Sequence, residues 1–592
     1  MQTPAPTSPL ALSALLISLA AARSLPKGQQ LHAHLLKYGH LPVSFPSSTA
    51  PLLSNHLITL YARCRLPSLS RRAFLDNPLR PPAAWSSLIA SFAQNEDPHS
   101  SLLSFREMLR ASVAPNDHTF PSATKSCAAL DLPSLGRSVH SLAAKTGFYS
   151  DVFVASSLVD MYAKCGLLVD ARRMFDEMPH KNVVSWSGLI SGYAQMGCEG
   201  EAVALFKRAL EAGLQPNDFT YSCVLRACGV LTLLEFGSQI HCRCVKSSYD
   251  SSPFVGSSLI SLYSKCGLVD FSYKVFDEMP ERNLGAWNAV LIASAQHGHT
   301  DTAFNRFREM EHSSSHPPNF ITFLCLLTAC SHAGLVEEGK RYFAMMSEQH
   351  GIQPGPQHYA TIVDLLSRAG KLKEAMDVIS QMPIPPTESV WGALLTGCRL
   401  HNDTETAAFA AEKLFETGST SSGAHMLLTN AYAAAGRYAE AARARKAMRD
   451  KGVRKETGLS WLETTGGAVH TFVSGDRSHA RSEEIYEALK MVGEKMEKAG
   501  YVADTSSVLR DVDGEEKKSS VWYHSERLAI GFGLLTVPEG RPIRVMKNLR
   551  VCGDCHTAIK YVSKVTGRVV ILRDNNRFHR FEDGVCSCGD YW

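Results

Sequence analysis

The segment Leu158-Val159-Asp160-Met161-Tyr162-Ala163-Lys164-Cys165-Gly166 returns as Leu259-Ile260-Ser261-Leu262-Tyr263-Ser264-Lys265-Cys266-Gly267, 101 residues further along the chain. Trp85, Trp186 and Trp287 each open a W-[SN]-x-[LV]-[IL] pattern and are separated by the same 101 residues. A fixed internal period predicts a repeat protein. One helical hairpin takes roughly 34 residues, so this period fits three unequal hairpins that form one unit.

The sequence between these landmarks favours helices. Ala171–Met178 is an amphipathic stretch that stops before Pro179, and similar stretches broken by Gly or Pro recur along the chain. Because each hairpin can bury its apolar face only against its neighbours, the predicted fold is an all-α solenoid of helix-turn-helix repeats with a long concave surface. Tetratricopeptide arrays, which bind proteins, have a similar period. The period alone therefore leaves the ligand open.

A different chemistry is indicated near the C-terminus. His524-Ser525-Glu526 is H-x-E, and Cys552-Gly553-Asp554-Cys555 is C-x-x-C. One imidazole and two thiolates leave a fourth zinc position open for water, which is what a catalytic zinc requires. Glu526 is the candidate for carrying protons between that water and a leaving amine. Val551 stands where the general deaminase signature has Pro, and C-x-x-C alone would also suit a redox pair.

A second set of ligand types follows the C-x-x-C motif. It comprises His556, His579, Cys586 and Cys588. Four protein ligands leave no position for a substrate water, so a zinc ion held by them would be structural.

The composition is that of a folded, water-soluble protein, with 592 residues, 45% hydrophobic and 20% charged, and a net charge of +4. Between Arg541 and Arg580, however, ten Lys or Arg face only Asp554 and Asp574. This concentration predicts a phosphate-bearing partner. Most of the sixteen cysteines stand singly in helical contexts, which favours a reducing compartment over a disulfide framework.

The N-terminus carries features of a targeting segment. No acidic residue precedes Asp76, as in organelle transit peptides. The apolar run Leu10 to Ala22 would suit a secretory signal, but it lacks a basic flank. Leu15 to Lys37 resembles the helix pair at Leu225 to Lys246, so we expect at most a short presequence in residues 1–14. No apolar run reaches the length of a bilayer span.

The C-terminal segment, residues 457–592, resembles the DYW domain of plant pentatricopeptide repeat proteins. The resemblance rests on Tyr523 to Ala529, Lys547 to His556 and the closing Cys586-Ser587-Cys588-Gly589-Asp590-Tyr591-Trp592. In that family the domain is a cytidine deaminase acting on organelle RNA, and Val before the C-x-x-C is usual. Family members usually have Pro where this chain has Ala503, in the box to which a substrate-gating role is attributed. The implied domain is an α/β zinc-dependent cytidine deaminase.

The resemblance assigns roles residue by residue. It places the catalytic zinc on His524, Cys552 and Cys555, and the proton-transferring acid on Glu526. It places a second, structural zinc on His556, His579, Cys586 and Cys588. Two zinc ions per chain are therefore expected.

The repeats resemble the P, L and S motifs of the same family, which bind single-stranded RNA one base per repeat. There the fifth and the last residue of a repeat contact the base. By family rules, Ser with Asn favours adenine, and Asn with Asn favours a pyrimidine. The resemblance implies five base-reading pairs: Ser86 with Asn116, Ser156 with Asn182, Ser187 with Asn217, Ser257 with Asn283, and Asn288 with Asn319.

The predicted organisation is a repeat solenoid over residues 15–386, the family's E1 and E2 motifs over 387–456, and the deaminase domain over 457–592. The expected function is site-specific C-to-U editing of organelle mRNA, without a membrane and with auxiliary editing proteins as further partners. The resemblance is closest to mitochondrial editing factors, with the plastid as the alternative compartment.

Three other functions remain open from the sequence. The first is an RNA-binding specificity factor that recruits another deaminase. The second is an RNA processing nuclease, because a zinc-activated water can also attack phosphate. The third is a protein-binding scaffold, which gives the zinc ligands no task.

Overall fold

The structure is a computed structural model that describes residues 8–41, 50–77, 79–313, 316–417, 422–454, 456–505 and 521–591. Residues 1–7 of the predicted presequence and the terminal Trp592 lie outside the described residues. The chain divides into two compact units, Met1–Ala227 and Cys228–Trp592. Within the described ranges, no helix combines the length and the apolar character needed to cross a membrane.

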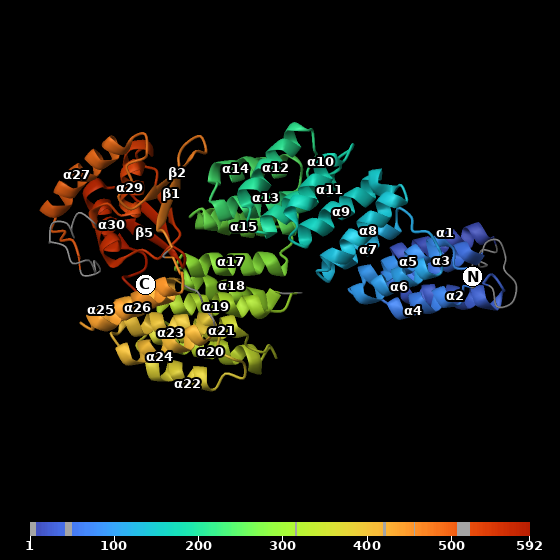
Figure 1. Cartoon of the computed structure of the whole chain (residues 1–592), viewed down its shortest axis with the longest axis horizontal. Coiled ribbons are helices and arrows are strands. Elements are labelled where there is room, and N and C mark those ends of the chain that lie inside the picture. The colour runs from blue at the N-terminus through green and yellow to red at the C-terminus, as the bar shows by residue number, and fades with distance from the viewer. Residues whose placement is uncertain are drawn as a thin grey trace. The chain divides into compact units, whose positions relative to one another are not determined.

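The first unit consists of paired helices (Figure 1). Its elements are α1 (Pro9–Ala21), α2 (Leu25–Lys37), α3 (Ala50–Arg63), α4 (Pro67–Leu75), α5 (Pro82–Gln94), α6 (Pro98–Arg110), α7 (Thr119–Ala129), α8 (Pro133–Lys145), the 3-10 turn η1 (Phe148–Ser150), α9 (Val152–Lys164), α10 (Leu168–Glu177), α11 (Val183–Gln195) and α12 (Glu199–Glu211). The next helix, α13 (Asp218–Leu231), contains the boundary between the two units.

The second unit continues the array and then carries the sheet. Its repeat helices are α14 (Leu234–Lys246), α15 (Pro253–Lys265), α16 (Val269–Glu278), α17 (Leu284–Gln296), α18 (Thr300–Ser313), α19 (Phe320–Ala333), α20 (Val336–Glu348), α21 (Pro356–Arg368), α22 (Leu372–Ser380), α23 (Glu388–Leu400), α24 (Thr404–Glu416), α25 (Ser422–Ala434) and α26 (Tyr438–Asp450).

The repeated segment explains how each hairpin is built. Leu158 and Leu259 are buried in α9 and α15, where the apolar positions recur with the helical period. Gly166 and Gly267 follow the ends of these helices with φ of 72° and 78°. A left-handed conformation at this position suits Gly and stops the helix, so the chain can turn back into the second helix of the hairpin.

The close packing of α21 against α23, the first helices of two successive hairpins, depends on a glycine in α23. A Cβ at Gly397 would stand 2.2 Å from the Cβ of Ser367 in α21, and 2.9 Å from its Cα. Gly397→Ala is therefore expected to lower the free energy of unfolding by about 1–3 kcal/mol, because α23 would have to move away from α21.

Thermal denaturation of the full chain measures this effect. Gly200→Ala in the first turn of α12 is the matched control, since a Cβ at Gly200 would meet nothing within 4 Å. Equal melting temperatures for the two variants would contradict the packing argument.

The C-terminal part of the second unit is an α/β domain (Figure 1). Its strands are β1 (Leu459–Glu463), β2 (Val469–Val473), β3 (Ile543–Lys547), β4 (Val570–Arg573), β5 (Phe578–Glu582) and β6 (Val585–Cys586), arranged in the order β2-β1-β3-β4-β5-β6. Strands β3 and β4 are parallel, and the other neighbours are antiparallel.

Among the residues of this domain that the structure describes, three helices accompany the sheet: α27 (Ser482–Lys498), α29 (Ser525–Thr536) and α30 (Gly553–Thr566). Leu528 from α29, Ile559 from α30 and Val545 from β3 meet in one buried core. The crossover from β3 to β4 runs through α30, as parallel pairing requires. The predicted fold class, an all-α solenoid followed by an α/β domain, is confirmed.

Candidate functional site

Two helix N-termini bring the predicted catalytic ligands together. His524 immediately precedes α29, and Cys552 immediately precedes α30, whose first turn contains Cys555. His524 Nδ1 lies 3.5 Å from Cys552 Sγ and 3.4 Å from Cys555 Sγ. With a carboxylate oxygen of Glu526, these donor atoms all lie within 4.8 Å of one another. One nitrogen and two sulfur donors at this spacing fit zinc.

Glu526 is buried beside these donors and has a cationic partner. Lys547 Nζ lies 2.8 Å from Glu526 Oε2, and Ser525 donates its hydroxyl to the same carboxylate oxygen at 3.1 Å. Burial alone would raise the pKa of Glu526, but the charge of Lys547 and its hydrogen bond outweigh burial and hold the pKa below its ordinary value. The carboxylate is thus held ionised at a position where it can exchange a proton.

A second buried network links the start of α30 to residues 500–504. Asp554, between Cys552 and Cys555, forms an ion pair with Arg527. It also accepts hydrogen bonds from Tyr501 Oη at 2.7 Å and from the backbone N–H of Asp504 at 2.8 Å. These contacts attach the segment 500–504, which includes Ala503, to the start of α30.

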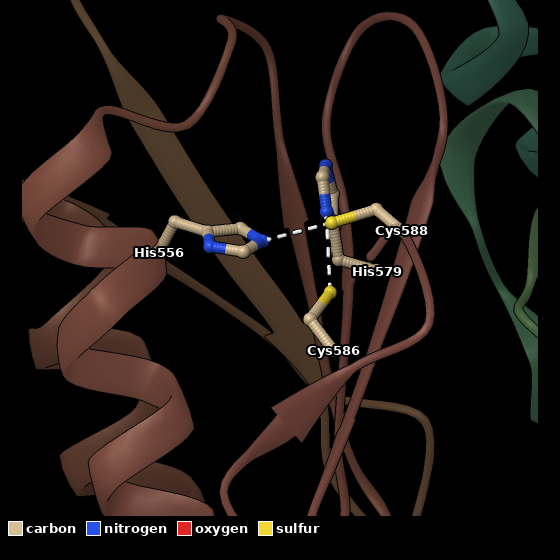
Figure 2. Close-up of side chains that lie close together, drawn as sticks. All are labelled: His556, His579, Cys586 and Cys588. Atoms are coloured by element: carbon tan, nitrogen blue, oxygen red, sulfur yellow. Dashed lines mark hydrogen bonds between the residues drawn. The ribbon is translucent and has the colours of Figure 1, made fainter. Parts of the chain in front are cut away.

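The other predicted ligand set is also assembled, as Figure 2 shows. His556 in α30 places Nε2 3.2 Å from Cys588 Sγ, and His579 in β5 places Nδ1 3.6 Å from Cys586 Sγ. The four donor atoms lie within 4.8 Å of one another. Two imidazoles and two thiols at this spacing fit a closed tetrahedral zinc site.

An acidic residue lies next to His579 of this second set. Asp574 Oδ2 lies 3.7 Å from His579 Nε2, on the side of the ring away from the thiols. Although burial opposes ionisation, the hydrogen bond to His579 and its charge lower the pKa of Asp574 to about 2. A carboxylate behind a histidine is the arrangement that orients a metal-ligating imidazole.

The predicted base-reading pairs are adjacent in space. The hydroxyl of Ser86 lies 2.9 Å from Asn116 Oδ1, that of Ser156 3.1 Å from Asn182 Oδ1, and that of Ser257 3.0 Å from Asn283 Oδ1. These serines are each the fifth residue of their helix, in α5, α9 and α15. Residues separated by 26 to 30 positions along the chain are therefore brought into contact.

The remaining two pairs are joined with the help of a threonine. Ser187 Oγ lies 2.5 Å from Thr220 Oγ1, which donates to Asn217 Oδ1 at 2.7 Å. The amide of Asn288 donates to Asn319 Oδ1 at 3.2 Å, and Thr322 Oγ1 donates to Asn288 Oδ1 at 2.8 Å.

Four of the asparagines also cap helices: Asn182, Asn217, Asn283 and Asn319. Asn182 Oδ1, for example, accepts from the backbone N–H of Ser185 at 2.9 Å at the start of α11. Because Oδ1 accepts these internal bonds, Nδ2 is the amide group that remains to face a ligand at Asn116, Asn182, Asn217 and Asn283 across the part of the chain that the structure describes. A hydroxyl residue three positions after the Asn is a capping-box signal, by which Thr220 and Thr322 could have been found in the sequence.

The basic stretch from Arg541 to Arg580 has a different explanation from the phosphate partner that its charge predicts. Of its ten basic side chains, Arg541, Lys564 and Arg580 belong to exposed residues. The others are wholly or partly buried, and most bond inside the protein, as Lys547 does with Glu526 and Lys560 does with Asp590 at 2.8 Å. Most of this charge therefore neutralises acidic groups or satisfies backbone carbonyls.

Family models match most of the chain from residue 83 onward. The model described as "DYW family of nucleic acid deaminases" matches residues 500–592. "E motif" and "E+ motif" models match residues 401–463 and 469–496. The PPR repeat models match residues 83–113, 153–183, 181–229, 257–284, 285–314, 321–350 and 358–383.

Similar proteins cover nearly the full length. A putative pentatricopeptide repeat-containing protein of Arabidopsis thaliana is 59% identical over 578 residues, which is 98% of this chain and 97% of that protein. Another from the same plant, named as mitochondrial, is 39% identical over 98% of this chain and 91% of that protein. Among solved structures, the pentatricopeptide repeat protein PPR10 from maize matches 76% of this chain and 70% of its own, with 15% identity and a TM-score of 0.46.

At 59% identity over 98% of its residues, with repeat, E, E+ and DYW models matched in this order, the chain belongs to the pentatricopeptide repeat proteins of the P, L and S type that carry a C-terminal DYW deaminase domain.

Proposed function

We propose that this protein binds a short single-stranded segment of an organelle transcript through its repeats and converts one cytidine, held just 3′ of that segment, to uridine. The observation that carries the proposal is the assembled set of His524, Cys552 and Cys555 beside the buried, ionised Glu526. Names of relatives that include "mitochondrial" or "chloroplastic" support an organelle. Mitochondria are our first choice.

The chemistry follows from the residues around this site. Zinc held by His524, Cys552 and Cys555 would supply an activated water for attack on C4 of cytosine. Glu526 accepts a proton from that water and delivers it to the departing amino group, so that cytidine and water give uridine and ammonia. Lys547 favours the ionised Glu526 carboxylate, which is the form needed before the first transfer and restored after the second. A single-stranded substrate avoids the cost of unpairing the base.

The second ligand set is proposed to hold a structural zinc. We expect two zinc ions per chain in the wild-type protein and one in Cys588→Ser, together with a lower melting temperature, because the ion links α30 to the last strands. Metal analysis and thermal denaturation of the purified full chain test this. Cys242→Ser is the control, since Cys242 is exposed and belongs to neither ligand set. Two ions retained in Cys588→Ser would disprove the second site.

The base-reading pairs are proposed to select bases through their asparagine amides. Asn182→Asp keeps an oxygen that caps α11 but replaces the Nδ2 donor by an acceptor. We expect roughly tenfold weaker binding to RNA with adenine at the matching position. RNA with guanine there should bind better, because guanine presents N–H donors to a carboxylate.

Binding assays with RNAs that differ at this one base measure the change. Asn402→Asp introduces the same charge on an exposed turn and should change no base preference. An equal loss of affinity for all four bases in Asn182→Asp would argue against direct reading.

The function itself is tested by sequencing mitochondrial and plastid cDNA from the source organism with and without this protein. One or a few cytidines left unconverted downstream of an A-rich match to the pairs would support editing and identify the organelle. Normal conversion at every site, accompanied by altered transcript ends, would reject deamination in favour of RNA processing.

A further inference from the structure

Four successive turns of the array in residues 228–592 contact the deaminase domain. Each turn joins the first helix of a hairpin to its second helix. Thr232 lies between α13 and α14, Gly267 between α15 and α16, His297 between α17 and α18, and Gly334 between α19 and α20. These four turns form one side of the array, here called the turn edge.

Strand β1 makes the polar contacts at the first of these turns. Glu463 accepts hydrogen bonds from the backbone N–H groups of Leu234 at 2.7 Å and of Glu235 at 3.2 Å, at the start of α14. Trp461 Nε1 donates to Thr232 Oγ1 at 3.0 Å. The first N–H groups of a helix have no partner within it, and the helix dipole favours a negative charge there. Glu463 therefore acts as a cap supplied by a distant domain.

Strand β5 and the residues just before it contact the next turns. The ring of Phe578 stacks on His297 with centroids 4.0 Å apart and planes 12° from parallel. Burial lowers the pKa of His297 to about 4, so this stack is neutral at physiological pH. Arg577 Nη2 donates to the carbonyl of His332 at 2.5 Å.

Two glycines of the turn edge lie directly against the deaminase domain. A Cβ at Gly267 would lie 3.2 Å from Ile571 Cγ2, and one at Gly334 would lie 3.0 Å from the ring of Tyr591. Larger residues at these turns would hold the two parts of the unit apart.

The turn edge and the base-reading residues occupy opposite ends of the same helices. Ser257 is the fifth residue of α15, whereas Lys265 ends that helix beside the deaminase domain. Eight residues of α-helix separate them by about 12 Å. Asn288 and His297 have the same relation along α17. Docking of the deaminase domain at one end is therefore compatible with RNA reading at the other.

We propose that the turn edge is a docking platform that fixes the deaminase domain at one place relative to bound RNA, and that Trp461 and Glu463 are positioning residues that determine which nucleotide is edited. The inference rests on the proposed function, since a choice of nucleotide exists only for an editing enzyme. Without these contacts the domain would be held only by its covalent connection after α26. Its active site could then reach several neighbouring nucleotides.

The test uses the full chain with Glu463→Ala, and Glu484→Ala as the control. Glu484 forms an exposed pair with Arg481 on α27. In hydrogen exchange, the amides of Leu234 and Glu235 should exchange about tenfold faster in Glu463→Ala and at the wild-type rate in the control. Thr232→Val together with Trp461→Phe should have a smaller effect of the same kind.

Deamination is then measured on a set of RNAs in which a single cytidine is moved one nucleotide at a time beyond the bound segment. The wild type should convert one position. Glu463→Ala should convert that position less and its neighbours more, with RNA affinity and zinc content unchanged.

Wild-type exchange rates at Leu234 and Glu235 in Glu463→Ala would overturn the docking. Faster exchange with conversion still confined to one position would overturn the positioning role. If the wild type shows the slow exchange but deaminates no RNA, the positioning role fails together with the proposed function, while the docking stands.

Discussion

Glu526→Gln is expected to lower the deamination rate by about 10²–10⁴, the usual contribution of a general acid–base residue, while RNA affinity and zinc content stay at wild-type values. Gln has the size of Glu and can still accept a hydrogen bond from Lys547, whose Nζ lies 2.8 Å from the carboxylate. It cannot, however, take a proton from the attacking water. The loss should therefore appear in kcat and not in RNA binding.

Single-turnover deamination of a bound RNA, with metal analysis of the same sample, measures this. Glu582→Gln is a matched control, because Glu582 is an exposed residue of β5 that pairs with Arg580. Full activity of Glu526→Gln in an extract, with none in the purified protein, would favour the alternative in which the chain recruits another deaminase. Full activity of the purified variant would falsify the role of Glu526.

Arg527→Met is expected to reduce the free energy of unfolding of the deaminase domain by roughly 3–5 kcal/mol, as breaking one side of a buried ion pair does. Arg527 and Asp554 are 4% and 3% exposed. Without the guanidinium, Asp554 keeps only Tyr501 and the N–H of Asp504 as hydrogen-bond donors among the contacts described above. A buried charge would remain without its counter-ion.

Denaturant unfolding of the full chain gives the size of this effect, and faster hydrogen exchange at the start of α30 would locate it. Arg580→Met removes an exposed ion pair with Glu582 and should cost no more than about 1 kcal/mol. Equal losses in the two variants would show that the Arg527 pair contributes no more than a surface pair does.

The fold and both candidate ligand sets could be predicted from the sequence because they depend on local sequence patterns. The 101-residue period and the helix-ending glycines predict the hairpins, and H-x-E, C-x-x-C and C-x-C place donor atoms a few residues apart. The match with plant relatives then confirms the family. The roles of the ligand and reading residues, and the domain boundaries at 386 and 456, stay predictions.

What local patterns could not supply are partners from distant elements. Lys547 belongs to a recognised motif, but only the pairing of β3 beside α29 brings it to Glu526. The contact between Tyr501 and Asp554 spans 53 residues. The basic stretch is misleading for the same reason, because counting charges along a chain does not reveal that Arg577 and Arg573 end at backbone carbonyls of distant repeats.

The asparagines of the proposed base-reading pairs both cap a helix and would contact a base, and this restricts which substitutions such a protein can accept. Asn182, Asn283 and Asn319 each cap a helix with the same side chain that contacts the other member of its proposed base-reading pair. Residues that start helices well are few, chiefly Asn, Asp, Ser and Thr. A mutation at one of these positions to any other residue would weaken the solenoid before it could recognise a new base. We therefore expect a change of RNA target at these positions to occur mainly by exchange among Asn, Asp, Ser and Thr.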